Sequence, residues 1–398
     1  MSIKTLKDVS ISSKTVLIRV DYNVPYDREM NIVDSTRITY TLPTINYCLE
    51  RKCKIIIVSH MGRPKGKVSP RMSLKPITAF LSGVLNREVQ FIETPIGETL
   101  KKQITSMKNG DIFLLENIRF YPEEEKNDDE FAKQLASLAD IYVNDAFAAA
   151  HNAHASICAV TRYAKESCAG FLLVKEIEYF ENAMAGARRP LCAIIGGAKV
   201  STKLRAILNI LPKVDTIIIG GGMAFTFLKS MGYDTGKSIM EKDLLEAAAT
   251  TVELARQHNT ELLLPIDIVA VKELSNDAAM TIVRVDEIPE DQMGIDIGPE
   301  TIKLFSNKIK EAETVIFNGP MGVFEIPNFA KGTNAISEAI AQSNCFSIVG
   351  GGDSITAIHT AGVEDKISYI STGGGAFLRL LEGKILPAVA ALDQPVTI

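Results

Sequence analysis

Short, nearly unbroken apolar runs alternate along the chain with segments in which apolar residues recur at helical spacing. TVLIRV at 15–20, KIIIV at 54–58 and LCAII at 191–195 are examples. An apolar run without alternation is typical of a strand buried on both faces of a parallel sheet. Strands that alternate with helices predict an α/β fold, and 398 residues exceed one ordinary domain, so we expect two domains.

Glycine-rich junctions follow the predicted strands of the second half. They are IIGGAK at 194–199, IIIGGG at 217–222, VIFNGP at 315–320, IVGGGDS at 348–354 and YISTGGG at 369–375. A tight turn explains one such junction. The carboxyl ends of parallel strands share one edge of a sheet, where open α/β folds bind ligands. The repetition therefore predicts a ligand site with glycine-rich walls.

The junction at Gly196 and Gly197 combines glycine with positive charge. Glycine allows the backbone to turn tightly and to approach a ligand closely. The following pattern predicts a helix over 200–208, with Lys199 and Lys203 on one face. Free amides at a helix N-terminus and two lysines favour a bound phosphate, whereas a helix start with solvated lysines is the structural alternative.

Polar and basic residues follow the predicted strands of the first half. Asp21 and Asn23 come after the first strand, where an Asx-type turn is the structural alternative. Arg37 lies in the first turn of a predicted helix, where a cation opposes the helix dipole unless an anion binds. The later junctions add His60, Arg63, Arg119, Asn144, Asp145, His151, Asn152 and His154. This clustering predicts a basic hollow, although His60 taken alone also fits a hydrogen-bonded turn.

A carboxylate stands beside one of the glycine junctions. Asp353 follows Gly350, Gly351 and Gly352, and a hard oxygen ligand beside a phosphate-binding loop suits Mg²⁺. A second run, 373–375, precedes another helix and directs free amides toward the same edge. These two features favour a nucleotide as the ligand.

Two other motifs predict no site. The acidic run 123–129 is interpreted as a solvated helix start rather than a metal site. GYDTGKS at 232–238 resembles a Walker A loop, but three residues separate its glycines where that loop needs four. We interpret it as a surface turn.

Composition limits the partners and the location. With 48 acidic and 43 basic residues the formal net charge is -5, which provides no bulk positive field for nucleic acid or an anionic membrane. No apolar run of about 18 residues is present, so no segment is expected to span a bilayer. The six cysteines form no C-x-x-C pair, and MSIKTLKDVS lacks the apolar segment of a signal peptide. We expect reduced thiols and a cytoplasmic protein.

Nine motifs, taken in order, resemble the signature motifs of the phosphoglycerate kinase family and cover nearly the whole chain. They are RVDYNVP, SHMGRP, LLENIRF, VNDAFAAAH, GGAKVSTK, GGGMAFTFLK, FNGPMGVFE, VGGGDS and STGGGAFLRLLEGK. The resemblance implies two Rossmann-like, three-layer α/β domains with parallel sheets, joined by a hinge helix whose motion closes a cleft. The implied boundaries are 1–170 for a phosphoglycerate-binding domain, 171–189 for the connecting helix, 190–386 for a nucleotide-binding domain, and 387–398 for a tail that returns to the first domain.

The resemblance also implies the reaction, carried out by a monomer in glycolysis. A phosphoryl group passes reversibly between 1,3-bisphosphoglycerate and ADP, giving 3-phosphoglycerate and ATP, with Mg²⁺ accompanying the nucleotide. In the reverse direction the acceptor is a carboxylate, which is already ionised near neutral pH, so no general base is required. Catalysis then depends on positioning and on charge stabilisation by Arg, Lys, free amides and a metal.

By position, the resemblance assigns three groups of residues. The substrate contacts are Asp21, Asn23, Arg37, His60, Arg63 and Arg119, with Asn152 at a further substrate position. The nucleotide contacts are Gly197, Lys203, Gly221, Gly222, Gly294, Asn318, Pro320, Val323, Glu325, Gly350, Gly351, Gly352, Asp353 and Ser354; Glu325 is the implied acceptor for the ribose hydroxyls, and Asp353 also the metal ligand. The groups around the transferring phosphoryl are Arg37, Lys199 and the amides of Gly373, Gly374 and Gly375.

One position departs from the family pattern. Asn152, in HNAHAS, stands where the family has an Arg that contacts the phosphate of the substrate. An amide donates a hydrogen bond without a full charge, which puts substrate affinity and its salt dependence in question. Arg162 would substitute if its loop folded back. A hinged ligand-binding protein and a catalytically weak relative are the competing interpretations.

Overall fold

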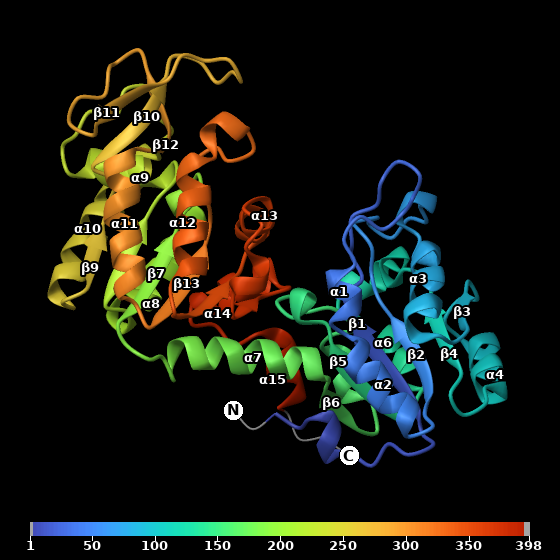
Figure 1. Cartoon of the computed structure of the whole chain (residues 1–398). Coiled ribbons are helices and arrows are strands. Elements are labelled where there is room, and N and C mark those ends of the chain that lie inside the picture. Colours follow the sequence, from blue (N-terminus) through green and yellow to red (C-terminus); the bar gives the residue numbers. More distant parts are fainter. Residues whose placement is uncertain (1–2, 394–398) are drawn as a thin grey trace. The chain divides into compact units, whose positions relative to one another are not determined.

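The computed structural model describes residues 3–393, which form two compact units (Figure 1). Of the described residues, unit 1 comprises 3–177 and 385–393, and unit 2 comprises Glu178–Lys384. The division falls inside helix α7 (Phe171–Met184), so the chain passes from one unit to the other in this helix and again after Lys384. The last five residues of the predicted tail lie outside the described residues.

Unit 1 is built on a parallel sheet of six strands in the order β3-β4-β2-β1-β5-β6. The strands are β1 (Thr15–Val20), β2 (Lys54–Val58), β3 (Val89–Ile92), β4 (Ile112–Leu115), β5 (Ile141–Asp145) and β6 (Ser167–Ala169). The α-helices, besides the first part of α7, are α1 (Thr36–Thr39), α2 (Leu42–Glu50), α3 (Lys75–Leu85), α4 (Glu98–Ser106), α5 (Pro122–Glu125), α6 (Asp129–Ala136) and α15 (Pro387–Leu392). Short 3₁₀ turns are η1 (Leu6–Asp8), η2 (Pro70–Met72), η3 (Ile118–Phe120), η4 (Phe147–Ala149) and η5 (Ala159–Arg162).

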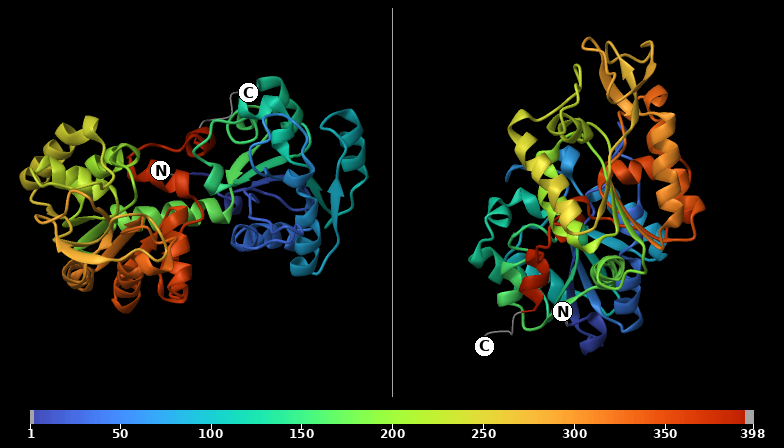
Figure 2. Two further views of the ribbon diagram at one scale, coloured as in Figure 1. Left: turned by 90° about the horizontal axis from the view of Figure 1, so that it is seen from above. Right: turned by 90° about the vertical axis from the view of Figure 1, so that its left-hand side faces the viewer.

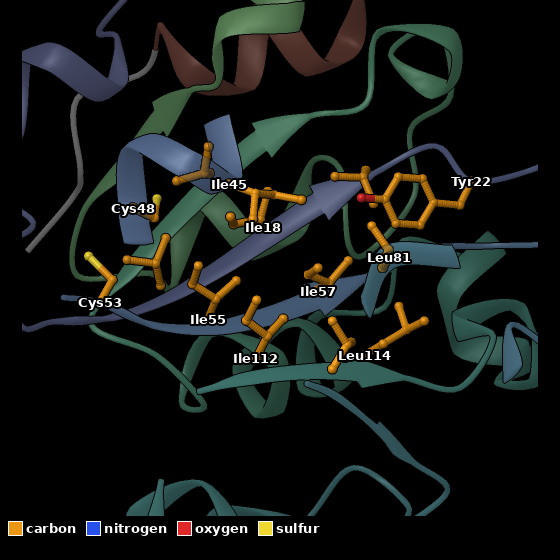
Figure 3. Close-up of a cluster of buried hydrophobic side chains, with 14 of the residues drawn as sticks. Ile18, Tyr22, Ile45, Cys48, Cys53, Ile55, Ile57, Leu81, Ile112 and Leu114 are labelled. Atoms are coloured by element: carbon orange, nitrogen blue, oxygen red, sulfur yellow. The ribbon is translucent and has the colours of Figure 1, made fainter. Parts of the chain in front are cut away.

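The apolar strands of unit 1 are covered on both faces. On one face, Ile18, Ile55 and Ile57 belong to one buried cluster with Ile45 and Cys48 of α2, as Figure 3 shows. Because side chains alternate along a strand, Arg19 points to the other face, where residues of α5 and of the segment before η5 meet it. Burial on both faces accounts for the unbroken apolar runs.

Unit 2 is built on a second parallel sheet, in the order β15-β14-β13-β7-β8-β9. The strands are β7 (Leu191–Ile195), β8 (Thr216–Ile219), β9 (Glu261–Leu263), β13 (Thr314–Asn318), β14 (Phe346–Val349) and β15 (Tyr369–Ile370). One face packs on α8 (Leu204–Ile210), α9 (Met223–Ser230), α10 (Leu245–Gln257) and α14 (Gly374–Leu381), and the other on α11 (Pro299–Glu311), α12 (Lys331–Gln342) and α13 (Gly352–Thr360). Short 3₁₀ turns are η6 (Val200–Thr202), η7 (Leu211–Lys213), η8 (Lys242–Leu244), η9 (Pro327–Phe329) and η10 (Glu364–Lys366).

A separate antiparallel sheet of three strands lies at one end of unit 2 (Figures 1 and 2). Its order is β11-β10-β12, with β10 at Asp267–Val271, β11 at Thr281–Arg284 and β12 at Met293–Ile297. The sequence did not predict this sheet.

The predicted fold class is confirmed: each unit has a parallel sheet between two helical layers. The predicted helix over 200–208 is wrong at its start, because η6 and the non-helical Lys203 precede α8. Among the described residues, no helix combines the length and the apolar character that crossing a membrane requires.

Candidate functional site

The segment after β1 is tied to the segment after β2 at the carboxyl edge of the unit 1 sheet. Asn23 Oδ1 accepts a hydrogen bond from Gly62 N at 2.9 Å, and the carbonyl of Asn23 accepts one from Arg37 Nη1 at 2.9 Å. Asp21 Oδ1 lies 3.3 Å from the same guanidinium nitrogen and also accepts from Asn23 N, which forms the Asx turn left open by the sequence. Asp21 and Asn23 therefore form the Asx turn and also contact other residues at this edge of the sheet.

Positive charge dominates this edge. Burial alone would raise the pKa of Asp21, but His60 when protonated, Arg37 and Arg19 lower it below its ordinary value. Burial, together with the facing arginines, lowers the pKa of His60 well below its usual range, so the ring is neutral at physiological pH. The arginines are therefore the side chains at this edge whose positive charge can bind an anion.

Two of these arginines are buried. Arg119 is 8% exposed, and its Nη1 donates to the carbonyl of Gly62 at 2.7 Å. Arg19, which the sequence did not single out, is fully buried and contacts Ser156 Oγ at 2.7 Å and His60 Nδ1 at 3.2 Å. These hydrogen bonds hold both guanidinium groups in position.

The prediction that the acidic run 123–129 is solvated is wrong at Glu124. Its side chain is fully buried, lies 3.9 Å from Arg19 Nη2 and accepts hydrogen bonds from Ser156 N and Oγ. Burial raises the pKa of Glu124, and Arg19 opposes that shift. The carboxylate of Glu124 is buried because it balances the positive charge of Arg19, which is itself fully buried.

The remaining predicted substrate residues differ in exposure. Arg63 is exposed in the turn after β2. Asn152 is half-buried after η4, and its Nδ2 donates to the carbonyl of Ala149 at 3.1 Å. Arg162 forms an ion pair with Asp129 at the surface, so it does not take the place of the missing arginine.

A pocket of about 220 Å³ opens at the carboxyl edge of the unit 2 sheet, where the antiparallel sheet meets it. Eight of the predicted nucleotide-binding residues line it: Gly197, Gly221, Gly222, Gly294, Pro320, Val323, Glu325 and Asp353. Its other lining residues are Ala198, Phe225, Ile239, Pro265, Ile268, Ile295, Asp296, Ile297, Met321 and Gly322. The wall is therefore largely apolar, with three carboxyl groups.

Glycine is required where backbone segments cross at the pocket. Gly221 has φ +71°, and a Cβ there would lie 2.7 Å from Gly197 N and 2.9 Å from the carbonyl of Pro320. A Cβ at Gly294 would lie 2.1 Å from the ring of Phe225. These close approaches explain why the junctions after β7, β8 and β13 are rich in small residues.

The two lysines of the first glycine junction have different environments. Lys199 is exposed and extended before η6. Lys203 Nζ donates to Asn318 Oδ1 at 2.6 Å and to its carbonyl at 2.7 Å. Burial lowers the pKa of Lys203 to about 8, and the nearby Asp353 opposes this.

Two helix N-termini meet beside the pocket. A Cβ on Gly374 would lie 3.5 Å from Gly352 N, so the starts of α14 and α13 are in near contact. Gly351 is the N-cap residue of α13, and Gly373 that of α14. Asn318 Nδ2 donates to the carbonyl of Gly350, and Ser354 Oγ accepts from Gly319 N. The first amides of a helix have no partner within that helix, so the two helix starts bring such amides close together.

The site could hold a metal only together with a ligand. Among residues 3–393, no three His, Cys, Asp or Glu side chains group closely enough to bind an ion by themselves. Asp353 is exposed in the first turn of α13 and lines the pocket. One carboxylate supplemented by phosphate oxygens and water is a common arrangement for Mg²⁺, so this donor set fits that ion.

The fold and the pocket place the chain among open α/β proteins that bind ligands at the carboxyl edges of parallel sheets. The family model described as phosphoglycerate kinase matches residues 6–384. The chain therefore belongs to the phosphoglycerate kinase family.

Individual relatives agree with this assignment. Phosphoglycerate kinase of Geobacter metallireducens is 51% identical over 395 residues, with 99% of each chain covered, and that of Dictyoglomus turgidum is 52% identical over 394 residues, again with 99% of each covered. The structure of phosphoglycerate kinase from Coxiella burnetii matches with TM-score 0.91 at 42% identity over 100% of both chains. That from Pyrococcus horikoshii matches with TM-score 0.84 at 31% identity over 98% of both. The predicted family and its phosphoryl-transfer activity are confirmed.

Proposed function

We propose that the unit 2 pocket binds ADP or ATP and that the basic residues at the carboxyl edge of the unit 1 sheet bind 3-phosphoglycerate or 1,3-bisphosphoglycerate. The observation that carries the proposal is the convergence of eight predicted nucleotide-binding residues, from five separate segments of the sequence, on one pocket. Apolar side chains such as Phe225, Ile239 and Ile268 suit the faces of a base. The exposed carboxylate of Glu325 suits the ribose hydroxyls.

The phosphates would lie at the starts of α13 and α14. Backbone amides at a helix N-terminus bind anions, and two such ends meet here. Asp353 would hold Mg²⁺ together with phosphate oxygens, and the ion would supply charge neutralisation between phosphates. Lys203 would add a positive charge, fixed in direction by Asn318.

The chemistry requires no proton acceptor. An oxygen of the 3-phosphoglycerate carboxylate attacks the terminal phosphorus of ATP, the bond from that phosphorus to the bridging oxygen breaks, and ADP leaves. We assign Arg37, Lys199 and the amides of Gly373, Gly374 and Gly375 to the negative charge on the transferring group. Because these groups come from both units, the proposal requires the units to close during turnover. We further propose a cytoplasmic monomer.

Ile239→Asp tests the nucleotide pocket. Ile239 lines the pocket but is 60% exposed, so the substitution should leave folding unchanged. It removes apolar contact and repels an anionic ligand, so we expect KM for ATP to rise about tenfold while KM for 3-phosphoglycerate stays the same. The measurement is a coupled assay with both substrates and Mg²⁺.

Ile282→Asp is the matched control, because Ile282 is 63% exposed on β11 and does not line the pocket. Equal KM values for ATP in the Ile239 variant and the wild type would place the nucleotide elsewhere. Binding of both ligands without turnover would favour a binding protein over a kinase.

A further inference from the structure

Asp296 is a carboxyl group in the nucleotide pocket that the sequence did not single out. It lies on β12, is 4% exposed and lines the pocket with Glu325 and Asp353. A third carboxyl group is unexpected in a pocket for an anion. Its role follows from the groups that its two oxygens contact.

Both oxygens of Asp296 are engaged by backbone amides. Oδ2 accepts a hydrogen bond from Gly332 N at 2.6 Å, and Oδ1 accepts one from Ile297 N at 2.9 Å. Gly332 is in the first turn of α12, so Asp296 satisfies one of the amides that this helix start leaves unpaired. Burial raises the pKa of Asp296 to about 7, and the two amide bonds oppose that shift.

The loop 319–325 packs directly on this carboxyl group. A Cβ at Gly322 would lie 2.6 Å from Asp296 Oδ1, so the loop approaches as closely as glycine permits. The same loop is bound to its neighbours at two further points. Val323 N donates to the carbonyl of Ile295 at 2.8 Å, and Met321 N donates to Thr333 Oγ1 of α12 at 3.1 Å.

We propose that Asp296 is a positioning residue for the nucleotide: by joining β12 to the start of α12, it fixes the loop that carries Pro320, Val323 and Glu325 to the pocket. The inference rests on the proposed function, because it assumes that the nucleotide occupies this pocket. Asp296 itself need not touch the ligand. Its loss should weaken nucleotide binding and leave the phosphoglycerate site unchanged.

Asp267 provides a matched control in the same small sheet. It lies on β10, the neighbour of β12, is 3% exposed and accepts hydrogen bonds from Thr301 N at 2.7 Å and Glu300 N at 3.0 Å. Asp267 therefore accepts hydrogen bonds from amides in the first turn of α11, as Asp296 accepts one from the first turn of α12. Asp267 does not line the pocket, and its side chain bonds to the start of α11, no residue of which lines the pocket.

The experiment compares Asp296→Asn, Thr333→Val and Asp267→Asn in the full chain. An asparagine at 296 offers one acceptor oxygen and one amino group, so one of the two backbone amides loses its partner. We expect the calorimetric Kd for ADP and the KM for ATP to rise about tenfold in Asp296→Asn and about threefold in Thr333→Val. KM for 3-phosphoglycerate should stay within about twofold in both variants.

Asp267→Asn separates positioning from general stability. We expect it to lower Tm and to leave the Kd for ADP unchanged. A folded Asp296→Asn variant with wild-type ADP affinity overturns the inference, as does an equal loss of ADP affinity in Asp267→Asn. Should Asp296→Asn not fold, Thr333→Val decides: unchanged ADP affinity refutes the positioning role, and weakened affinity supports it.

Ile239→Asp distinguishes this inference from the proposed function. If nucleotide affinity is unchanged in that variant, the pocket is not the nucleotide site. The positioning role of Asp296 is then refuted as well. Weakened affinity in Ile239→Asp with no effect of Asp296→Asn leaves the pocket in place and removes only the positioning role.

Discussion

Lys199 and Lys203 are four positions apart, yet their surroundings suit different tasks. Lys203 is partly buried and donates to both oxygens of Asn318, so its position is fixed. Lys199 is exposed, and its long side chain is free to follow a group that changes position during a reaction. The sequence predicted both as cations but could not distinguish them, because the break between η6 and α8 depends on tertiary packing.

Lys199→Ala should lower kcat on the order of a hundredfold or more, because it removes a charge assigned to the transferring phosphoryl group. The variant should fold normally, since the side chain is exposed. The measurement is kcat at saturating substrates, and Lys242→Ala, which alters another exposed lysine of unit 2, is the control. Near-wild-type kcat in Lys199→Ala contradicts the assigned role.

Asn152→Arg should lower KM for 3-phosphoglycerate about fivefold, because a guanidinium adds a full charge where the amide supplies only a dipole. The salt dependence of KM should become steeper. Steady-state kinetics at two ionic strengths measure both effects, with Asn152→Gln as a neutral control of similar polarity. If KM does not change, the arginines already present are sufficient.

At this scale, the sequence suggested residues that come soon after a strand and missed a residue whose burial depends on a distant partner. Asp21, Asn23 and Gly221 could be selected because each follows a strand directly. Glu124 could not, since its burial depends on Arg19, which is over a hundred positions away. Ile239 carried no signal at all, because an exposed apolar residue in a loop belongs to no periodic pattern.

The start of α7 is capped by two residues from other elements. Asp145, at the end of β5, accepts hydrogen bonds from Leu172 N at 2.8 Å and Leu173 N at 3.1 Å. Thr44 Oγ1 of α2 accepts from Phe171 N at 2.9 Å. Burial raises the pKa of Asp145 to about 7, and the bonds from Thr44 and the two leucine amides oppose this.

Asp145→Asn should change how the stability of unit 1 depends on pH. Between about pH 4 and pH 7 the wild-type carboxyl is protonated when folded and ionised when unfolded, so its contribution to stability falls as the pH rises through this window. The variant does not titrate, so its stability relative to the wild type should improve by about 1 kcal/mol per pH unit up to pH 7. Urea unfolding at several pH values measures this, with the exposed Asp277→Asn as the control. A constant difference across the window contradicts the raised pKa.

Among the elements, the parallel strands were the most predictable and the antiparallel sheet the least. Strands buried on both faces leave unbroken apolar runs, which the sequence displays openly. Strand β11 is mostly exposed and carries no such run. The prediction of a helix over 200–208 was wrong at its start for another reason. The spacing of apolar residues does not show that tertiary packing makes the first turn the 3₁₀ turn η6.

At the scale of the molecule, unit 1 is completed by the far end of the chain. Helix α15 packs on η5 and β6, and Ala388 N donates to the carbonyl of Ala150 at 3.1 Å. Four apolar side chains of this segment are buried: Leu386, Ala388, Val389 and Leu392. The length of the chain predicted two domains, but only the resemblance to a family indicated that the tail returns to the first.

Removal of residues 385–398 should destabilise unit 1 on the order of 5 kcal/mol, because those apolar side chains lose their burial and the partners they cover become exposed. The ADP affinity of unit 2 should be unchanged. Scanning calorimetry with and without ADP separates the two transitions, since ADP raises only that of the unit that binds it. An equal loss in both transitions would contradict the assignment of α15 to unit 1.

The double passage of the chain between the units also bears on its biosynthesis. A ribosome that has translated the first 177 residues has not yet made the segment that seals unit 1. Unit 1 therefore lacks the segment that begins at Ile385 while all of Glu178–Lys384 is synthesised and begins to fold. Chaperones that bind exposed apolar surface would meet the nascent chain during this interval.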